Sequence, residues 1–206
     1  MSIVKLSNNG VKNATAFGSI TGLGNMVFIK KLTASSSATL SFVDGSSDVV
    51  LDDTYKEYLF TFKNMHPATD EVYFSFQGNA AGGSGYNETI TSTFFTAYHG
   101  EGGAGGELEY GSSRDQAQGT AVQNLTDAIG NDNDQNASGY LHLFNPSSTT
   151  FVKHFIGAAN ISQHGDFTMN SYCAGYFNTT SAIDEIQFSM SSGNIDAGDI
   201  CLYGIA

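Results

Sequence analysis

The chain has 206 residues, a formal net charge of −12 at pH 7 and 40% hydrophobic residues, with 15 Phe, 10 Tyr and no Trp. This composition excludes an intrinsically disordered chain, and the length allows one domain with a substantial core. The acidic charge speaks against binding to nucleic acid and to anionic membranes. No apolar run approaches the ~20 residues of a membrane helix, so we expect no membrane insertion.

Residues 1–24 are polar, punctuated by glycine and without a strand pattern. Residues 1–63 hold six of the eight basic residues against five acids, whereas residues 64–206 hold two against 15 acids. A flexible N-terminus and an arm that orders on a partner both fit this segment. We take 1–24 as a docking arm, followed by one β-sandwich domain at 25–206. The segment lacks the apolar core of a secretion signal, which predicts synthesis in a cytoplasm.

Short β-rich runs follow from residue 25, and those of the first half lie at 25–32, 37–43, 55–62, 72–77 and 89–98. Their period-2 alternation predicts antiparallel strands with one buried face. In 72–77 the alternation puts Phe74 and Phe76 inside, and Ser75 and Gln77 outside. The residues that we expect in the core are Phe60, Phe62, Phe74, Phe76, Phe188 and Leu202.

Two glycine-rich segments, 78–88 and 99–111, are predicted as long loops. Residues 114–129 form the one stretch with helical periodicity. Its apolar residues fall near one face of a 3.6-residue repeat, and they are Ala117, Ala121, Val122, Leu125 and Ile129. Gly130 would end such a helix. We expect a short helix that covers one end of the domain.

Strand patterns resume at 140–145, 150–157, 169–177, 182–190 and 199–205. Nine or ten short strands with regular turn signals and one helix predict an all-β fold. The expected architecture is an antiparallel, jelly-roll-like β-sandwich.

Motifs for catalysis and metal binding are weak. Asp132 and Asp134 open a segment like that of a calcium loop, but Ala137 and Leu143 stand where the loop needs Gly and Glu. A looser calcium site and a solvated turn both stay open for the two aspartates. The five His residues lack zinc spacing, and no nucleophile elbow or phosphate loop occurs. We expect no cofactor, no metal, no catalytic residue and no enzyme activity.

Cys173 and Cys201 can form a disulfide, but two apolar thiols in strands fit better. Tyr86, Tyr98 and Tyr110 lie in or beside the glycine-rich segments and are our candidates for ligand or subunit contact. Tyrosine offers rigid amphipathic contact area, and loops on a rigid scaffold often carry binding. A place in the core or at its rim explains each of them as well. The lack of Trp speaks against a carbohydrate-binding module, although Tyr and Phe can replace it.

Three long stretches, 32–87, 139–156 and 190–206, resemble a β-sandwich domain of virion-surface and tail-fibre-type proteins of tailed bacteriophages, notably those of marine cyanobacteria. The matching motifs are Tyr-Lys-Glu-Tyr at 55–58, Asn-x-His-Pro-Ala-Thr-Asp at 64–70, Asn-Pro-Ser-Ser at 145–148 and the final Gly-Asn-Ile-x-x-Gly-x-Ile-x-Leu-Tyr-Gly at 193–204. The resemblance covers nearly all of 25–206 and includes no catalytic motif.

This resemblance implies a place on the virion and a structural role as a tail-fibre-type or adhesin component. Capsid decoration is the alternative of the same class, and a polysaccharide-active enzyme is the alternative of another class. The implied partners are other virion proteins, further copies of the chain in a homotrimer, and a glycan or protein of the host surface.

Overall fold

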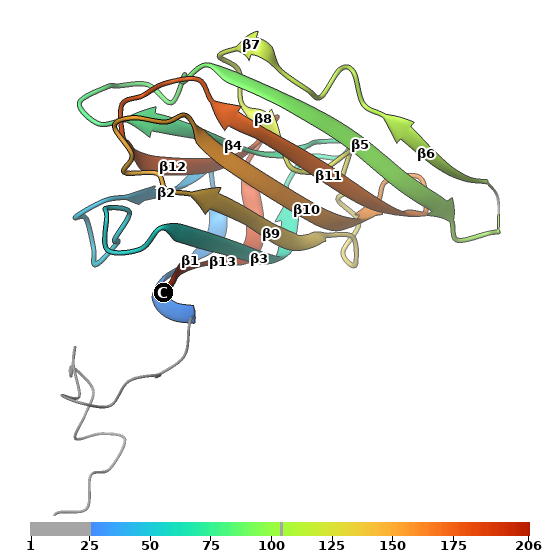
Figure 1. The fold of residues 1–206 in the computed structure, drawn as a ribbon. Coiled ribbons are helices and arrows are strands. Elements are labelled where there is room, and N and C mark those ends of the chain that lie inside the picture. The colour runs from blue at the N-terminus through green and yellow to red at the C-terminus, as the bar shows by residue number, and fades with distance from the viewer. Residues whose placement is uncertain (1–25, 104) are drawn as a thin grey trace, which may run out of the picture.

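The computed structural model describes residues 26–103 and 105–206. In this part of the chain every regular element is a strand, and no helix that could cross a membrane occurs. The strands form two antiparallel sheets, which give an all-β, sandwich-like fold (Figure 1). The predicted docking arm, 1–24, lies outside the described residues and stays a prediction.

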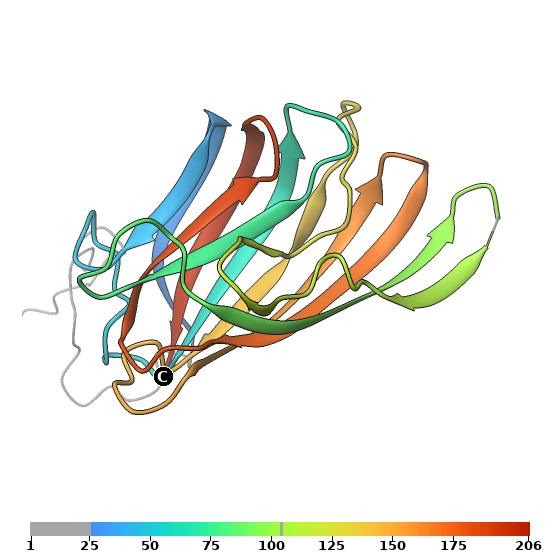
Figure 2. The same ribbon diagram turned by 90° about the horizontal axis from the view of Figure 1, so that it is seen from above.

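The larger sheet has nine strands, and eight of them lie side by side in a fan (Figure 2). Their order is β1 (Met26–Ser37), β13 (Ile195–Ile205), β3 (Glu57–Pro67), β9 (Ala137–Phe144), β10 (Lys153–Gln163), β11 (Phe167–Phe177), β5 (Ile90–Gly100) and β6 (Gly106–Tyr110), and β7 (Ala117–Gly119) also pairs with β5. The smaller sheet has the order β2 (Thr39–Val43), β12 (Ile183–Met190), β4 (Phe74–Ala80) and β8 (Gln123–Asn124).

A cluster of phenylalanine rings fills the space between the sheets. Phe188 of β12 stacks on Phe74 with ring centroids 5.6 Å apart, and Phe42 and Phe60 meet it edge-on at 6.2 and 5.5 Å. All six residues that the sequence predicts as core are at most 2% exposed. The period-2 patterns therefore identified the buried face correctly.

Strand β4 is buried on both faces, which the alternation did not predict. Phe74 and Phe76 point inward as expected, but Ser75 and Gln77 are also at most 1% exposed. Residues 123–129 pair along the edge of β4, and the Gln77 side chain donates hydrogen bonds to the carbonyls of Thr120 and Ala121, just before this paired stretch. A polar side chain tolerates this burial because its hydrogen bonds are made.

The predicted helix at 114–129 is wrong, since this segment consists of turns and the short strands β7 and β8. Ala117 and Val122 are exposed, so its apolar residues share no single face. Side-chain amides bind the backbone in place of helical hydrogen bonds. Gln116 donates to the carbonyls of Ala121 and Val122, and Gln123 donates to that of Arg114. Such local bonds compete with the helix.

The predicted loop at 99–111 is also mostly wrong. Strand β5 continues to Gly100, and β6 pairs with it from Gly106 to Tyr110, so the segment is a hairpin with a glycine-rich tip. The polar and apolar residues that alternate in Glu107–Tyr110 form a strand, which pairs with the second half of β5. The other predicted loop, 78–88, begins later than expected because β4 extends to Ala80.

Both cysteines lie in strands of the larger sheet, Cys173 in β11 and Cys201 in β13, and both are free thiols. Burial raises the pKa of the Cys173 thiol to about 12. A buried thiol with a raised pKa is chemically inert, so Cys173 acts as a small apolar core residue.

Asp199 of β13 joins three neighbouring strands on their outer side. It accepts a hydrogen bond from Thr33 Oγ1 at 2.6 Å, and its carboxylate lies 3.3 Å from the Nζ atoms of Lys31 and Lys63. The Thr33 hydrogen bond, followed by the two lysines, holds the pKa of Asp199 below its ordinary value of 3.8.

We expect Asp199→Asn to lower the free energy of unfolding by about 1 kcal/mol near neutral pH, since exposed ion pairs contribute about 0.2–1 kcal/mol each. The folded pKa is depressed, so the stabilisation is complete above pH 4 and is lost as the pH falls through the folded value. Melting temperatures of both proteins from pH 2 to pH 7 should therefore converge at the acidic end. A difference that stays constant over this range would contradict the ionic origin.

Candidate binding face

The outward side of β9, β10, β11 and β5 forms one continuous surface, which we call the outer face. In Figure 1 these four strands lie side by side at the front. Among their residues Lys153 is the only Asp, Glu, Lys or Arg. Its side chain is buried on the inner side, where Nζ donates to the carbonyl of Thr179 at 3.0 Å. The outer face thus carries no Asp, Glu, Lys or Arg side chain.

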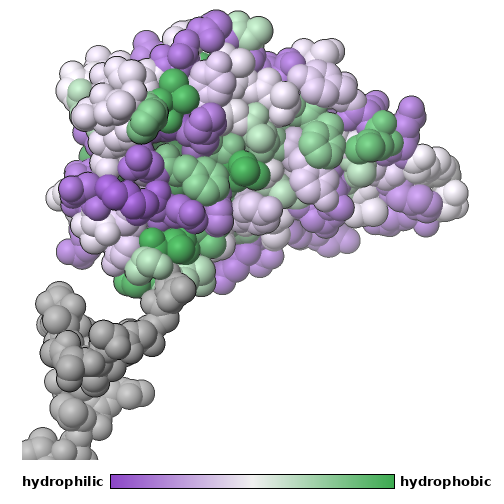
Figure 3. Space-filling model, viewed as in Figure 1, coloured by the Kyte–Doolittle hydropathy of each residue, from purple (hydrophilic) through white to green (hydrophobic). Residues whose placement is uncertain are grey.

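Aromatic rings form a row across this face because the strand register places them opposite one another. Tyr140 pairs with Ala158, Ala158 with Tyr172, Tyr172 with Phe95, and Phe95 with Tyr110. The four rings are 39–55% exposed. Phe95 and Tyr172 stack at 4.9 Å with an interplanar angle of 15°. Four strands, β9, β11, β5 and β6, therefore each present one ring of this aromatic row to solvent. Figure 3 shows the side of the molecule on which the outer face lies.

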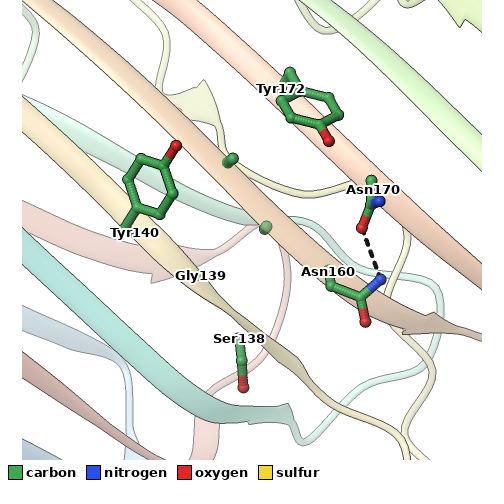
Figure 4. Close-up of a pocket in the computed structure, with 8 residues that line it drawn as sticks. Ser138, Gly139, Tyr140, Asn160, Asn170 and Tyr172 are labelled. Atoms are coloured by element: carbon green, nitrogen blue, oxygen red, sulfur yellow. Dashed lines mark hydrogen bonds between the residues drawn. The ribbon is translucent and has the colours of Figure 1, made fainter.

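A groove interrupts the row at Ala158. The small Ala158 side chain separates the rings of Tyr140 and Tyr172, and the cavity between them has a volume of about 200 Å³ (Figure 4). Gly139 and Ala159 complete its floor. A Cβ atom on Gly139 would collide with the carbonyl oxygen of Ala158, so glycine at this position lets β9 and β10 approach closely.

Two amides line one end of the groove. The side-chain nitrogen of Asn160 donates to Oδ1 of Asn170 at 2.8 Å and to Oγ1 of Thr168 at 3.1 Å (Figure 4). This bond orients both amides. Among the residues that the structure describes, Oδ1 of Asn160 and Nδ2 of Asn170 have no side-chain or backbone partner. The groove therefore offers one oriented acceptor beside one oriented donor.

The neighbouring cavity extends the same surface toward β5. It has a volume of about 240 Å³, and Ala97, His99, Thr168 and Asn170 line it. Asn170 borders both cavities. The second hollow therefore lies beside the aromatic row, where Asn170 pairs with Ala97 and Thr168 with His99, and it meets the groove at Asn170.

The three tyrosines that the sequence singled out do not share one surface. Tyr86 lies between β4 and β5, where burial, and then a hydrogen bond with Glu185 of β12, raises the pKa of its phenol. Tyr98 points to the inner side of β5, packs edge-on against Phe167 and donates to Glu107 at 3.1 Å. Tyr110 is the one that belongs to the aromatic row, and its hydroxyl donates to Asp115 at 2.6 Å.

Sequence reasoning missed Tyr140, Asn160 and Asn170 as members of a binding surface. The sequence does contain a pattern that could have identified these residues. The outward positions of 90–98, 140–145, 150–157 and 169–177 hold rings, amides, hydroxyls and aliphatic side chains but no formal charge, whereas the chain as a whole has 14% charged residues. The lack of charge at these positions indicates a specialised surface. Only the strand order shows that the positions are neighbours in one continuous face.

A third hollow, of about 350 Å³, lies at one end of the domain and is acidic. Asp44, Asp52, Asp53 and Asp184 line it. Burial, followed by repulsion from Glu185, raises the pKa of Asp184, whereas hydrogen bonds from Thr54 lower the pKa of Asp52. Asp132 and Asp134 are exposed in a turn far along the chain from these residues. Within the described residues, no group of three or more His, Cys, Asp or Glu side chains could hold a metal ion.

No protein family, curated protein or solved structure matches the chain. Its function has to be inferred from its own surface.

Proposed function

We propose that the chain is a non-enzymatic structural protein of a virion surface, of the tail-fibre or adhesin type, and that the outer face is its binding surface. The observation that supports binding is the aromatic row on a sheet face without formal charge, in a protein of net charge −12. Exposed apolar patches on soluble proteins are often functional. The observation that supports the virion is the resemblance of the sequence to phage surface domains.

The remaining parts of the proposal concern the connectivity of the strands and the assembly of the protein. The first five strands alternate between the two sheets, which fits a jelly-roll-like connectivity. A homotrimer would set several outer faces around one axis, and other virion proteins would hold it, with residues 1–24 as the docking arm. Multiple copies raise the overall affinity for a repetitive host surface even when one face binds weakly.

We expect the soluble protein to compete with the phage that encodes it for adsorption to host cells, and Ile156→Glu to reduce this competition at least about tenfold. Ile156 is 48% exposed on the outer face, and its replacement puts an unpaired charge into the contact. The measurement is the concentration of protein that halves adsorption. The matched control is Phe151→Glu, at a residue that is 68% exposed in the turn before β10.

Three outcomes would overturn the proposal. Equal competition by both variants would move the binding surface elsewhere. A dense coat of the protein on capsids, with none at the tail in electron micrographs, would favour capsid decoration instead. Absence of the protein from purified particles would remove the virion role altogether.

The acidic hollow supports a second candidate, a polysaccharide-active enzyme. Glycoside hydrolysis needs one carboxyl group that stays protonated and one that stays ionised, and the opposite pKa shifts of Asp184 and Asp52 fit those two roles. If this candidate is correct, the protein releases reducing ends from host polysaccharide, and Asp184→Asn loses at least about 100-fold of that activity. Lack of any release by the wild-type protein excludes it.

A further inference from the structure

We propose that the groove between Tyr140 and Tyr172 binds one sugar ring of a neutral glycan chain, and that the chain continues past Asn170 into the hollow beside β5. This inference rests on the proposed function, since it names the ligand of the same outer face. It commits to a glycan, and a protein partner or a second copy of the chain becomes an outcome of the test.

The rings suit the apolar side of a pyranose. Its C–H groups gain dispersion contacts on an aromatic face without losing hydrogen bonds. Both rings are held in place before the ligand arrives. Tyr172 stacks on Phe95, and Tyr140 meets His142 edge-on at 5.9 Å. A site that is already ordered pays less entropy on binding.

The amides suit the hydroxyl groups of the same sugar. Adjacent hydroxyls on a pyranose each donate and accept, so one pair can bind Oδ1 of Asn160 and Nδ2 of Asn170 at once. The Asn160–Asn170 hydrogen bond fixes the direction of both amides. Because Asn170 also borders the next cavity, it can contact two consecutive sugars.

The size of the groove matches one ring. Pockets for drug-sized ligands have volumes of about 300–1,000 Å³, whereas the two hollows here have about 200 and 240 Å³. Two small hollows in series therefore fit a chain of small units better than one large molecule.

Charge decides between a neutral glycan and the other occupants. A protein with net charge −12 repels an anionic polysaccharide, and it repels a second copy of itself wherever the contact lacks basic residues. The outer face offers no lysine or arginine to offset either repulsion. A protein partner that covered the face would also bury the free groups of Asn160 and Asn170, which is costly unless they are matched. A neutral chain of hydroxyl groups meets neither penalty.

The experiment uses an array of neutral hexose and N-acetylhexosamine oligosaccharides together with sulfated and uronic-acid chains. We expect the wild-type protein to bind neutral chains of two or more units. The best of them is then titrated calorimetrically against three variants. Ala158→Leu fills the groove and should abolish binding. Asn170→Ala should weaken it about tenfold, since it removes hydrogen bonds with a net value of about 0.5–1.5 kcal/mol each.

The matched control is Ala197→Leu, which adds the same bulk at an exposed position of β13, a strand of the larger sheet that lies outside the outer face. It should bind like the wild type. Equal melting temperatures of the two leucine variants would show that both are folded. Binding by Ala158→Leu at wild-type affinity would overturn the inference, as would preference for sulfated or uronic-acid chains.

The proposed function and this inference fail separately. If Ile156→Glu abolishes competition for adsorption but Ala158→Leu competes like the wild type, the outer face is the binding surface and the sugar groove is wrong. If neutral glycans bind in the groove but the soluble protein never blocks adsorption, the groove is correct and the adhesin role is wrong. Self-association that Ala158→Leu abolishes, seen by sedimentation, would replace the glycan with a second copy.

Discussion

Replacing Phe188 by alanine is expected to lower the free energy of unfolding by about 3–5 kcal/mol, the usual cost of deleting a buried phenylalanine ring. Phe188 is fully buried and contacts four other phenylalanine rings from both sheets, namely Phe42, Phe60, Phe74 and Phe76. Neighbouring rings cannot close the space without losing contacts of their own. Unfolding by urea, followed by fluorescence or circular dichroism, measures the loss.

The control for this prediction is Phe151→Ala. Phe151 is 68% exposed, so the same deletion there should change the stability by less than about 0.5 kcal/mol. A loss at Phe188 no larger than the loss at Phe151 would show that the aromatic cluster does not hold the two sheets together.

The second large effect is expected for Gly139→Ala, with a loss of about 1–3 kcal/mol, as for other overpacked sites, or more. The added methyl group would collide with the carbonyl oxygen of Ala158 and lie 2.7 Å from Cα of Ala159. Both are backbone atoms of the adjacent strand, so no side chain can rotate away. Strands β9 and β10 would have to separate at the centre of the larger sheet, beneath the groove.

Gly102→Ala is the matched control, since no atom lies within 4 Å of a Cβ built on Gly102 at the tip of the β5–β6 hairpin. It should leave the stability nearly unchanged. The melting temperatures of both variants are compared with that of the wild type. If Gly139→Ala melts like Gly102→Ala, then β9 and β10 have room for a side chain, and the shape of the groove does not depend on glycine.

These two variants link stability to the proposed site. Phe188 holds the sheets together on the inner side, and Gly139 sets the distance between two strands that carry the groove on the outer side. A rigid scaffold is what places Tyr140, Tyr172 and the amide pair in a fixed array. Binding and stability should therefore both fall in Gly139→Ala, whereas Ala158→Leu should reduce binding alone.

The sequence by itself determined the fold class and most of its strands. Alternation of apolar and polar residues is local, so the runs around Phe60, Phe74 and Phe188 identified both the strands and their buried sides. Pattern analysis failed at 114–129, where the spacing of Leu125 and Ile129 resembles the apolar spacing of a helix. In the folded protein part of this segment pairs along the edge of β4, and its glutamines bind backbone carbonyls instead.

Only the tertiary structure decided which residues share a surface. The order β9, β10, β11, β5, β6 brings a strand from residues 90–100 next to one from 167–177, and no local pattern encodes that pairing. It separates Tyr86, Tyr98 and Tyr110, which are close in sequence, and it aligns Tyr140, Tyr172 and Phe95, which are not. The physical reason is that a strand's period fixes the side on which a residue points, whereas long-range register fixes its neighbours.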